Sequence, residues 1–214
     1  MKNNEDLVKY AKAHVGEPYW FGCYGQTATK ALLNSKKSMY PEYYTSSDFN
    51  KQIGHRVHDC VGLIKGYLWS DTLNSNPKYN SSQDKNAEGM YNASEYKGNI
   101  NCIPNVNGVL VYKKSGYRIH HVGVYSTDGY VYEAKGHKYG VVKTKFNKSD
   151  WQLWSYCPYI KYGTSTKTKK SNNTIADEII AGKWGTGDDR KKRLQKAGYD
   201  YKAIQLIVND RLGR

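Results

Sequence analysis

The chain has 214 residues, of which 38% are hydrophobic and 14% are aromatic, including 21 tyrosines. This length suits one medium domain with a small second one. The apolar and aromatic content is enough to close a core, which excludes a wholly disordered chain. The 33 basic and 19 acidic residues leave a formal net charge of +14, and an excess of this size predicts a polyanionic partner.

No segment approaches the roughly 20 consecutive apolar residues that cross a bilayer, so we expect no membrane insertion. The N-terminal residues Met-Lys-Asn-Asn-Glu-Asp turn acidic where a signal peptide would need its apolar region, so we also expect no signal peptide. The four cysteines are too sparse for a disulfide scaffold in a chain of this size. Each is therefore treated as a free thiol and a candidate nucleophile.

The distribution of the basic residues narrows the choice of partner among nucleic acid, an anionic membrane surface and a cell wall that carries teichoic acid. Residues 161–170 hold four lysines and no acidic residue, and they form the densest basic segment. The sequence has no long basic stripe with the arginine chemistry of base recognition. The pattern therefore argues against nucleic acid and leaves the other two partners open.

The N-terminal part of the chain is predicted to be mainly helical. Apolar residues at helical spacing predict one helix over residues 4–14 and another over 27–36. Between them, a glycine-rich loop around Tyr19-Trp20-Phe21 is interpreted as a binding wall. A third helix, buried on most sides, follows Asp59 as its N-cap, so Cys60 is expected in its first turn.

The rest of the larger domain is predicted to be a surface excursion followed by a sheet. Residues 70–107 are polar and without a sustained period, apart from a short helix near 87–91, and such segments are often lids or binding loops. Strand-like segments follow at 108–112, 120–125, 130–134, 141–144 and 151–160. Helices followed by a meander predict an α+β fold, with helices packed on an antiparallel sheet of about five strands.

The C-terminal part is predicted to be a separate small domain. Residues 161–173 are poor in apolar side chains and rich in Thr, Ser and Lys, which is typical of a linker. Residues 174–214 contain three short amphipathic segments, which predict a three-helix domain. The chain is thus divided into a domain over residues 1–160, the linker, and the C-terminal domain.

Among the four cysteines, Cys60 has the sequence context of a nucleophile. A catalytic thiol needs a helix N-terminus or a nearby histidine to lower its pKa. Cys60 is expected at such a terminus, and His121 lies on a later strand. A cysteine beside Val and Leu is otherwise usually a small buried hydrophobe, and Cys23, Cys102 and Cys157 are interpreted as structural thiols.

A zinc site is an alternative use of the same residues. His55, His58 and Cys60, together with His120 and His121, have side chains that bind zinc. We do not favour this site, because His55 and His58 precede a helix and do not form paired two-ligand knuckles. His120 also alternates with His121 and is expected on the opposite side of the strand. No metal and no cofactor are predicted.

Three motifs in a fixed order resemble one protein family. They are Gly-Glu-Pro-Tyr-Trp-Phe-Gly at 16–22, Asp-Cys-Val-Gly-Leu at 59–63 and His-Val-Gly-Val-Tyr at 121–125. This combination resembles the NlpC-type papain-like cysteine peptidases, which cut the stem peptides of peptidoglycan. The resemblance covers most of residues 1–160.

The resemblance implies a role for each matching residue. Cys60 corresponds to the nucleophile, His121 to the general base, and Tyr19 to the tyrosine that helps to stabilise the oxyanion. The third position, often a histidine just before an alanine, is Glu133 here, and its carboxylate can accept the imidazole N–H. Trp20 and Asp59 are assigned to substrate binding.

The sequence departs from the family pattern in three places. Val61 replaces the usual serine, and the segment between Tyr19 and Cys60 is longer than in compact members, as is the excursion over 70–107. These differences leave the catalytic groups intact and bear on substrate preference. His137 is a weaker alternative to Glu133, since the neighbouring glycine indicates that the strand has ended.

The tail carries a second resemblance. The sequence from 175 to 194, with Ala-Gly-Tyr-Asp at 197–200, resembles the Cpl-seven-type cell-wall-binding repeat found at the ends of phage lysins. The resemblance implies binding to the glycan-peptide unit of peptidoglycan. Trp184 is a candidate for stacking on a sugar, with Asp188 and Arg190 as hydrogen-bonding candidates. The alternative is that Trp184 fills the core of the small helix bundle.

The two resemblances together imply a phage endolysin-like peptidoglycan hydrolase of a Gram-positive wall, held in the host cytoplasm until lysis. The expected reaction is amide hydrolysis through a Cys60 acyl-enzyme, at the bond between γ-D-glutamate and the diamino acid of the stem peptide. One alternative is an N-acetylmuramoyl-L-alanine amidase or cross-bridge endopeptidase, and another is a non-catalytic wall-binding protein. The sequence does not determine the host, the diamino acid or the oligomeric state.

Overall fold

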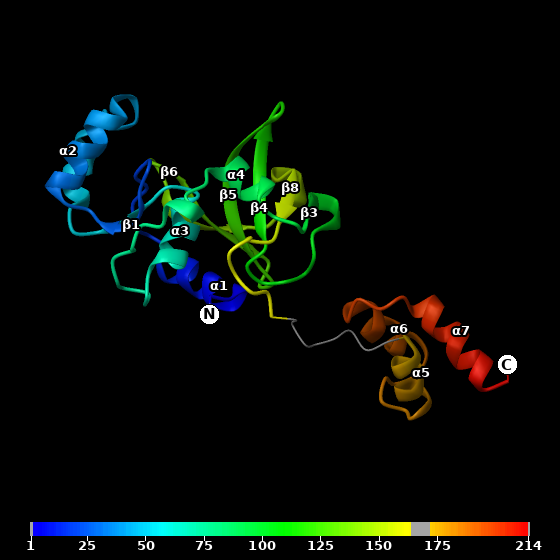
Figure 1. The fold of residues 1–214 in the computed structure, drawn as a ribbon. Helices are drawn as coiled ribbons and strands as arrows, with labels where there is room; N and C mark the ends of the chain where they lie inside the picture. Colours follow the sequence, from blue (N-terminus) through cyan, green and yellow to red (C-terminus); the bar gives the residue numbers. More distant parts are fainter. Residues whose placement is uncertain (1, 164–171, 214) are drawn as a thin grey trace. The chain divides into compact units, whose positions relative to one another are not determined.

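The computed structural model describes residues 2–163 and 172–213 (Figure 1). The chain separates into two compact units, residues 1–163 and 164–214. Lys161 is tied to the first unit by hydrogen bonds between its backbone and those of Lys2 and Asn4. Asn172 begins the first helix of the second unit. The centre of the predicted linker, residues 164–171, lies outside the described residues.

The elements follow one another in a mixed order that Figure 1 labels. The helices are α1 (Asn4–Ala13), α2 (Lys30–Met39), α3 (Gly62–Trp69), α4 (Ala87–Asn92), α5 (Asn172–Ile180), α6 (Gly187–Lys196) and α7 (Tyr201–Arg211). The strands are β1 (Tyr24–Thr27), β2 (Arg56–His58), β3 (Lys97–Asn99), β4 (Leu110–Ser115), β5 (Arg118–Ser126), β6 (Tyr130–Gly136), β7 (Gly140–Lys145) and β8 (Leu153–Ser155). Among the described residues, no helix is both long and apolar enough to cross a membrane.

The main sheet is antiparallel and has the strand order β3-β8-β4-β5-β6-β7. The predicted α+β class is confirmed, but the sheet has six strands instead of about five. The additional strand is β3, which lies inside the excursion that was expected to be irregular. Three residues are too few to show a strand's alternation of apolar and polar side chains, so the sequence pattern did not reveal it. The short helix predicted in the same excursion is present as α4.

The sheet is buried on both faces because its side chains alternate between them. On one face, a core forms between the sheet and helices α1, α3 and α4; it includes Leu7, Leu63, Ile64, Met90, Leu110, Val122, Val124 and Ala134. On the other face, a second core contains Ile100, Val109, Val111, Tyr125, Val131 and Trp151. The residues of β5 thus contribute to both cores in turn, which fixes the register of this strand.

The segment between β1 and β2 forms a third core together with the loop that precedes β1. The two strands pair in antiparallel fashion from Tyr24 opposite His58 to Thr27 opposite Arg56, and this pairing closes the base of the segment. Inside it, α2 begins at Lys30 because the Thr29 side chain accepts a hydrogen bond from the Leu32 N–H at 3.1 Å. The buried side chains are Trp20, Cys23, Ala28, Leu33, Tyr44, Phe49 and Val57. The longer segment before Cys60 is therefore a packed structure.

The C-terminal unit consists of α5, α6 and α7, as predicted. Its core contains Ile175, Ala176, Ile179, Leu194, Ile204 and Val208, contributed by all three helices. The Asp200 carboxylate accepts hydrogen bonds from the N–H groups of Lys202 and Ala203 and so caps α7.

Two histidines are buried where α1 crosses the end of β2. His58 is fully buried, and its Nε2 lies 3.0 Å from the Tyr10 hydroxyl, while His14 Nδ1 lies 2.8 Å from the Tyr10 carbonyl oxygen. The centroids of the two imidazole rings are 4.8 Å apart. Burial lowers the pKa of both histidines, and the charges of His14 and Arg56 lower that of His58 further. Both rings are therefore neutral in the folded chain at neutral pH.

This pair predicts a loss of stability in mild acid. Below the ordinary histidine pKa of 6.5, the unfolded chain binds protons that the folded chain excludes, so the free energy of unfolding falls as the pH decreases. Urea unfolding at pH 7.5 and 5.5 should give a lower midpoint at pH 5.5. The difference should shrink in His14→Phe and persist in His120→Gln, which changes an exposed histidine. An identical pH dependence in His14→Phe would contradict this explanation.

Candidate active site

The turn before α3 presents Cys60 at the start of the helix. The Asp59 carbonyl accepts a hydrogen bond from the Leu63 N–H at 3.0 Å, and the Asp59 side chain accepts one from the Gly62 N–H. Helix α3 itself begins at Gly62, two residues later than expected, so Cys60 lies in the capping turn. Gly62 is required there, because a Cβ atom would stand 1.9 Å from the Cys23 carbonyl oxygen.

The pairing of β5 with β6 does not extend to the candidate base. In β5, Val124, Tyr125 and Ser126 are paired with β6, whereas His121 and Val122, at the other end of the strand, are not. The Tyr125 N–H donates to the Val109 carbonyl on the β4 side, so by alternation the Val122 N–H faces β6. The Val122 N–H lies near the Cys60 thiol and lowers its pKa, so the thiol is close to the backbone of the residue that follows His121.

His121, Glu133 and Thr144 form a hydrogen-bonded row across three neighbouring strands. His121 Nε2 lies 2.6 Å from Glu133 Oε2, and the Thr144 hydroxyl donates to Glu133 Oε1 at 2.8 Å. Glu133 is completely buried. Burial alone would raise the pKa of its carboxyl, but the hydrogen bonds from His121 and Thr144 hold the pKa below its usual range. The carboxylate therefore accepts from Nε2–H, which leaves His121 Nδ1 free to accept a proton.

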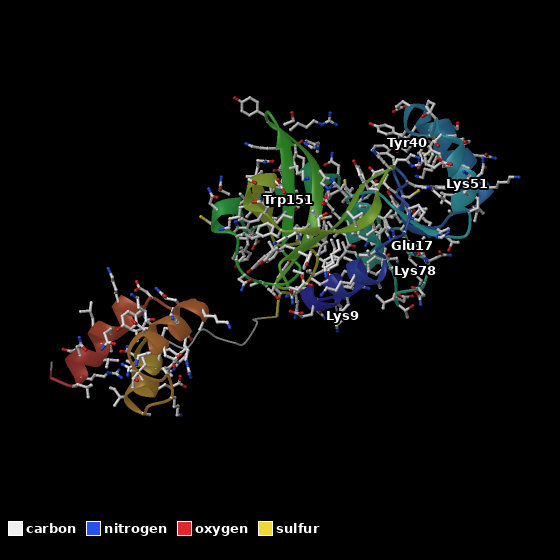
Figure 2. All side chains as sticks on the ribbon, turned by 180° about the vertical axis from the view of Figure 1, so that it is seen from behind. Lys9, Glu17, Tyr40, Lys51, Lys78 and Trp151 are labelled. Atoms are coloured by element: carbon white, nitrogen blue, oxygen red, sulfur yellow. The ribbon has the colours of Figure 1, made fainter. Side chains whose placement is uncertain are left out.

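Trp151 covers this row from the second core. The plane of its ring is inclined by 23° to the His121 imidazole, with 5.9 Å between the ring centroids. The Lys113 ammonium lies 4.7 Å from the centroid of the Trp151 ring, which is labelled in Figure 2. Gly123 makes room for this arrangement, because a Cβ atom there would lie 3.0 Å from the indole and 2.5 Å from Val131. Trp151 thus restricts water around the histidine–carboxylate pair.

The Cys60 thiol is protonated in the resting site. Burial raises its pKa to about 12, and the nearby Asp59 charge raises it as well, whereas the backbone N–H groups of Val122, Val61 and Cys60 lower it. A thiol with this pKa is neutral at pH 7. Attack on a carbonyl group therefore requires that the proton leave for a neighbouring base as the bond forms.

Cys60 and Tyr19 line the same cleft, which has a volume of about 840 Å³. Burial, followed by the charges of Asp59 and Cys60, raises the pKa of the Tyr19 hydroxyl. This hydroxyl therefore remains protonated and can donate a hydrogen bond. The structure brings Tyr19, Asp59 and Cys60 together in the cleft and His121 with Glu133 in the adjoining row.

Asp59 combines a structural position with a place in the cleft. Its carboxylate accepts hydrogen bonds from the N–H groups of Gly62 and Gly22, the latter at 2.9 Å. Burial raises its pKa, and these two hydrogen bonds and the charges of Lys65 and Lys36 oppose the rise. With both carboxylate oxygens engaged by the backbone, Asp59 primarily orders the loop that carries the nucleophile.

Trp20 is not brought to the cleft. Its side chain is fully buried, lies edge-on to Tyr44 and Phe49, and donates from Nε1 to the Gln52 side-chain oxygen at 2.6 Å. The predicted substrate contact is therefore not supported by the position of this residue. The aromatic run Tyr19-Trp20-Phe21 does contribute to the wall of the cleft, as predicted, but the residues that line it are Tyr19 and Phe21.

The histidines of the alternative zinc site do not converge. His55 is exposed and lies 3.2 Å from a Glu17 carboxylate oxygen, whereas His58 is buried against Tyr10. Within residues 2–163 and 172–213, no group of three metal-binding side chains forms. His137 packs on Phe49 with ring centroids 4.1 Å apart and is not part of the row with Glu133.

The remaining cysteines have different surroundings from Cys60. Cys23 and Cys157 are buried, and burial raises the pKa of each to about 12. Cys102 is exposed. All four cysteines are free thiols.

The three candidate residues of the C-terminal unit lie around one turn. Trp184 is half-buried, donates from Nε1 to Glu178 at 3.0 Å and meets the Tyr199 ring edge-on. Arg190 is half-buried and donates to the Gly185 carbonyl, while Asp188 is exposed. These contacts support a packing role for Trp184 and leave part of its ring accessible.

Thr144, Val122 and Trp151 were not singled out from the sequence. Thr144 lies diagonally across from Glu133, because Val131 pairs with Thr144 and Glu133 with Val142. The sequence did place the Thr144 hydroxyl on the predicted strand that follows the strand of Glu133, and this neighbouring position could have indicated a contact between the two side chains. Val122 acts through its backbone and Trp151 through the fold, so neither had a signal in the local sequence.

The comparisons with known proteins divide along the chain. Residues 173–212 match the family model of the CW_7 repeat, which confirms the repeat predicted in the tail. A stretch of 43 residues is 49% identical to the lysozyme of Streptococcus phage Cp-7 and covers 20% of this chain. The match spans 13% of the length of that relative.

Several solved structures are similar to this chain at low sequence identity. The peptidoglycan hydrolase RipB of Mycobacterium tuberculosis has 19% identity and a TM-score of 0.44, covering 74% of this chain and 65% of its own. The P60 domain of an antigen from M. avium subspecies paratuberculosis has 18% identity and a TM-score of 0.44, covering 73% and 95%. The NlpC/p60 domain of the peptidoglycan hydrolase SagA has 14% identity and a TM-score of 0.39, covering 72% and 97%.

The hydrogen bond from Thr144 predicts a measurable change in Glu133. Thr144→Val keeps the shape of the side chain but removes the donor, so the pKa of Glu133 should rise toward or above its ordinary value. Carboxyl ¹³C chemical shifts followed by NMR during a pH titration would measure the change. Thr144→Ser retains the hydroxyl and should leave the pKa close to that of the unaltered chain. An unchanged pKa in Thr144→Val would show that the hydroxyl does not stabilise the carboxylate.

Proposed function

We propose that the chain is a phage lysin-like peptidoglycan hydrolase in which Cys60 cuts an amide bond of the stem peptide and the C-terminal repeat binds the wall. The observation that carries this proposal is the row of His121, Glu133 and Thr144, which begins on the strand whose Val122 backbone lies near the Cys60 thiol. The match of residues 173–212 to the CW_7 repeat and the related phage lysozyme support the wall as the target. The motifs of residues 1–160 that resemble NlpC-type peptidases support the reaction class.

The geometry supports a two-step hydrolysis through an acyl-enzyme. In the first step, His121 Nδ1 accepts the thiol proton as the Cys60 sulfur attacks the scissile carbonyl carbon. The imidazolium that forms is stabilised by the Glu133 carboxylate, which Thr144 holds in place. His121 then gives this proton to the leaving amine, and the C–N bond breaks to leave a thioester on Cys60.

The second step uses the same groups in reverse. His121 accepts a proton from a water molecule, which attacks the thioester carbonyl and releases the carboxylate product and the Cys60 thiol. In both steps the carbonyl oxygen becomes negatively charged. The Tyr19 hydroxyl and the backbone N–H of Cys60 are the proposed donors to this oxyanion, and the raised pKa of Tyr19 keeps its proton available.

The bond that we propose to be cut lies between γ-D-glutamate and the diamino acid of the stem peptide. Mass spectrometry of digested walls distinguishes this bond from the alternatives, because only this cut frees the amine of the diamino acid while γ-D-glutamate stays on the glycan-linked fragment. An amidase would instead release the whole stem peptide from the sugar, and a cross-bridge endopeptidase would separate stems that remain attached to the glycan.

The proposal predicts that Cys60→Ala and His121→Ala each abolish wall lysis without loss of wall binding. Each change removes one partner of the proton transfer, and effects of at least about 1,000-fold on kcat are usual for such groups. Turbidity of a wall suspension measures lysis, and co-sedimentation measures binding. The control is Cys102→Ala, which removes an exposed thiol and should leave lysis unchanged. Lysis by the Cys60→Ala protein would exclude this mechanism, and inactivity of the unaltered chain on every wall tested would favour a non-catalytic binding protein.

The C-terminal repeat predicts a separable effect on wall binding. Removing residues 172–214 should lower the fraction that sediments with walls but change hydrolysis of a soluble muropeptide by less than about twofold, since the units have separate cores. Asp188→Ala and Arg190→Ala test the proposed contacts within an intact repeat, with Lys202→Ala as an exposed control. Unchanged sedimentation of the shortened chain would show that the repeat is not the anchor.

A further inference from the structure

An aromatic wall flanks the cleft that contains Cys60. Phe21 and Tyr43 lie face to face, with ring centroids 3.9 Å apart and planes inclined by only 5°, and Tyr40 meets Phe21 edge-on at 5.1 Å. Tyr40 follows α2, where it is labelled in Figure 2, and Tyr43 ends the short 3₁₀ helix Pro41–Tyr43. Tyr40 and Tyr43 therefore belong to the packed segment between β1 and β2, whereas Phe21 lies in the loop just before β1.

The outer part of this wall is open. Tyr43 is 48% exposed and Met39 beside it is 58% exposed, although both are large apolar side chains. The inner part is held by the structure beneath, since the Tyr44 hydroxyl donates to the Phe21 carbonyl at 2.6 Å and Lys36 donates to the Gly22 carbonyl at 2.7 Å. The stack is thus a supported surface, and the exposure of its apolar side chains indicates a binding site for a ligand.

The wall has the nucleophile on one side and a second hollow on the other. Phe21 and Tyr43 line the 840 Å³ cleft together with Cys60, and they also line a hollow of about 220 Å³ with Phe49 and His137. Tyr19, the proposed oxyanion donor, lines both. A ligand group resting on the stack is therefore in the same cleft as the Cys60 thiol.

Other residues that line the cleft have a different chemistry. They include the Lys65–Asp84 ion pair together with Glu88 and Arg118. These charged groups suit the carboxylates and amines of a peptide. The aromatic wall offers instead the outer ring face of Tyr43, which Phe21 backs from behind, and the Met39 thioether. These groups suit the C–H face of a pyranose ring through dispersion and the electron-rich ring face.

The proposed scissile bond sets how far a sugar would lie from Cys60. This step rests on the function proposed above, in which the bond that is cut follows the second residue of a stem peptide attached to the glycan strand. Two extended α-linked residues span about 7 Å, and the γ-linkage of glutamate and the lactyl group that joins the stem to the sugar lengthen this span further. A cleft of 840 Å³ is large enough for such a peptide and one sugar. This spacing allows the sugar to rest on the outer part of the cleft wall while the scissile bond lies at the thiol.

We propose that Phe21 and Tyr43 form a carbohydrate subsite that binds the sugar bearing the stem peptide. The enzyme then distinguishes stems that are still attached to the glycan from free peptides. The segment between β1 and β2, which contains Tyr43, would provide this selectivity. Its extra length would then serve substrate recognition, since catalysis does not require it. The C-terminal repeat anchors the protein to the wall, whereas this subsite selects the substrate at the point of cleavage.

Kinetics on two soluble substrates test the subsite. One is a disaccharide that carries the stem peptide, and the other is the same peptide without sugar. Tyr43→Ala should lower kcat/KM on the disaccharide-peptide about tenfold and change it by less than twofold on the free peptide. Tyr43→Phe keeps the ring and should behave as the unaltered chain on both. Tyr96→Ala, which removes an exposed tyrosine outside the cleft, is the matched control.

A binding measurement makes the test independent of turnover. In the full chain carrying Cys60→Ala, calorimetry should show weaker binding of the disaccharide-peptide when Tyr43→Ala is added, with the repeat contributing equally to both proteins. Equal losses on the two substrates, or equal binding of the disaccharide-peptide, would overturn the subsite while leaving the hydrolase intact. Failure of the unaltered chain to cut either substrate, while binding the disaccharide-peptide through Tyr43, would instead reject the proposed function and retain the sugar site.

Discussion

The candidate site depends on the place where β5 and β6 stop pairing. The pairing of β5 with β6 ends at Val124, and the backbone of Val122, beyond this point, lies near the Cys60 thiol. The His121 and Glu133 side chains, which come from the same two strands, meet at 2.6 Å. The neighbouring ladders are also irregular here, because the β4–β5 register shifts between Lys113 and Lys114 and the β6–β7 register shifts between Ala134 and Gly136. The candidate site therefore lies where the sheet departs from regular pairing.

Burial has opposite consequences for the acidic groups of this site. It holds Cys60 as a thiol by raising its pKa to about 12, whereas Glu133 remains ionised because His121 and Thr144 supply hydrogen bonds to its charge. The resting site therefore separates a neutral thiol from a charged carboxylate. In the proposed reaction, proton transfer to His121 Nδ1 accompanies attack, and the neighbouring carboxylate stabilises the positive charge that results.

The packed segment between β1 and β2 links stability with specificity. It has its own core around Trp20, Leu33 and Phe49, and its closing strands lead directly into Asp59 and the turn that carries Cys60. Tyr40 and Tyr43 of the aromatic wall come from the same segment, and Phe21 from the loop just before it. We therefore expect changes in this core to alter the position of Cys60 as well as the shape of the cleft, while the C-terminal unit has a separate core.

The sequence by itself determined the α+β class, the three-helix tail, and Cys60, His121, Glu133 and Tyr19 as candidates, because local periodicity and motifs in order carry that information. Only the tertiary structure decided which side chains meet. Trp20 and Phe21 are neighbours in one aromatic run, but the Trp20 side chain is buried in a core and Phe21 lines the cleft. Burial depends on what packs against each residue. The register of β6 against β7 brings the Thr144 hydroxyl into hydrogen-bonding distance of Glu133. Strand β3, which has only three residues, pairs with β8 at the edge of the sheet. Such contacts arise between segments distant in the chain, where local sequence patterns have no direct signal.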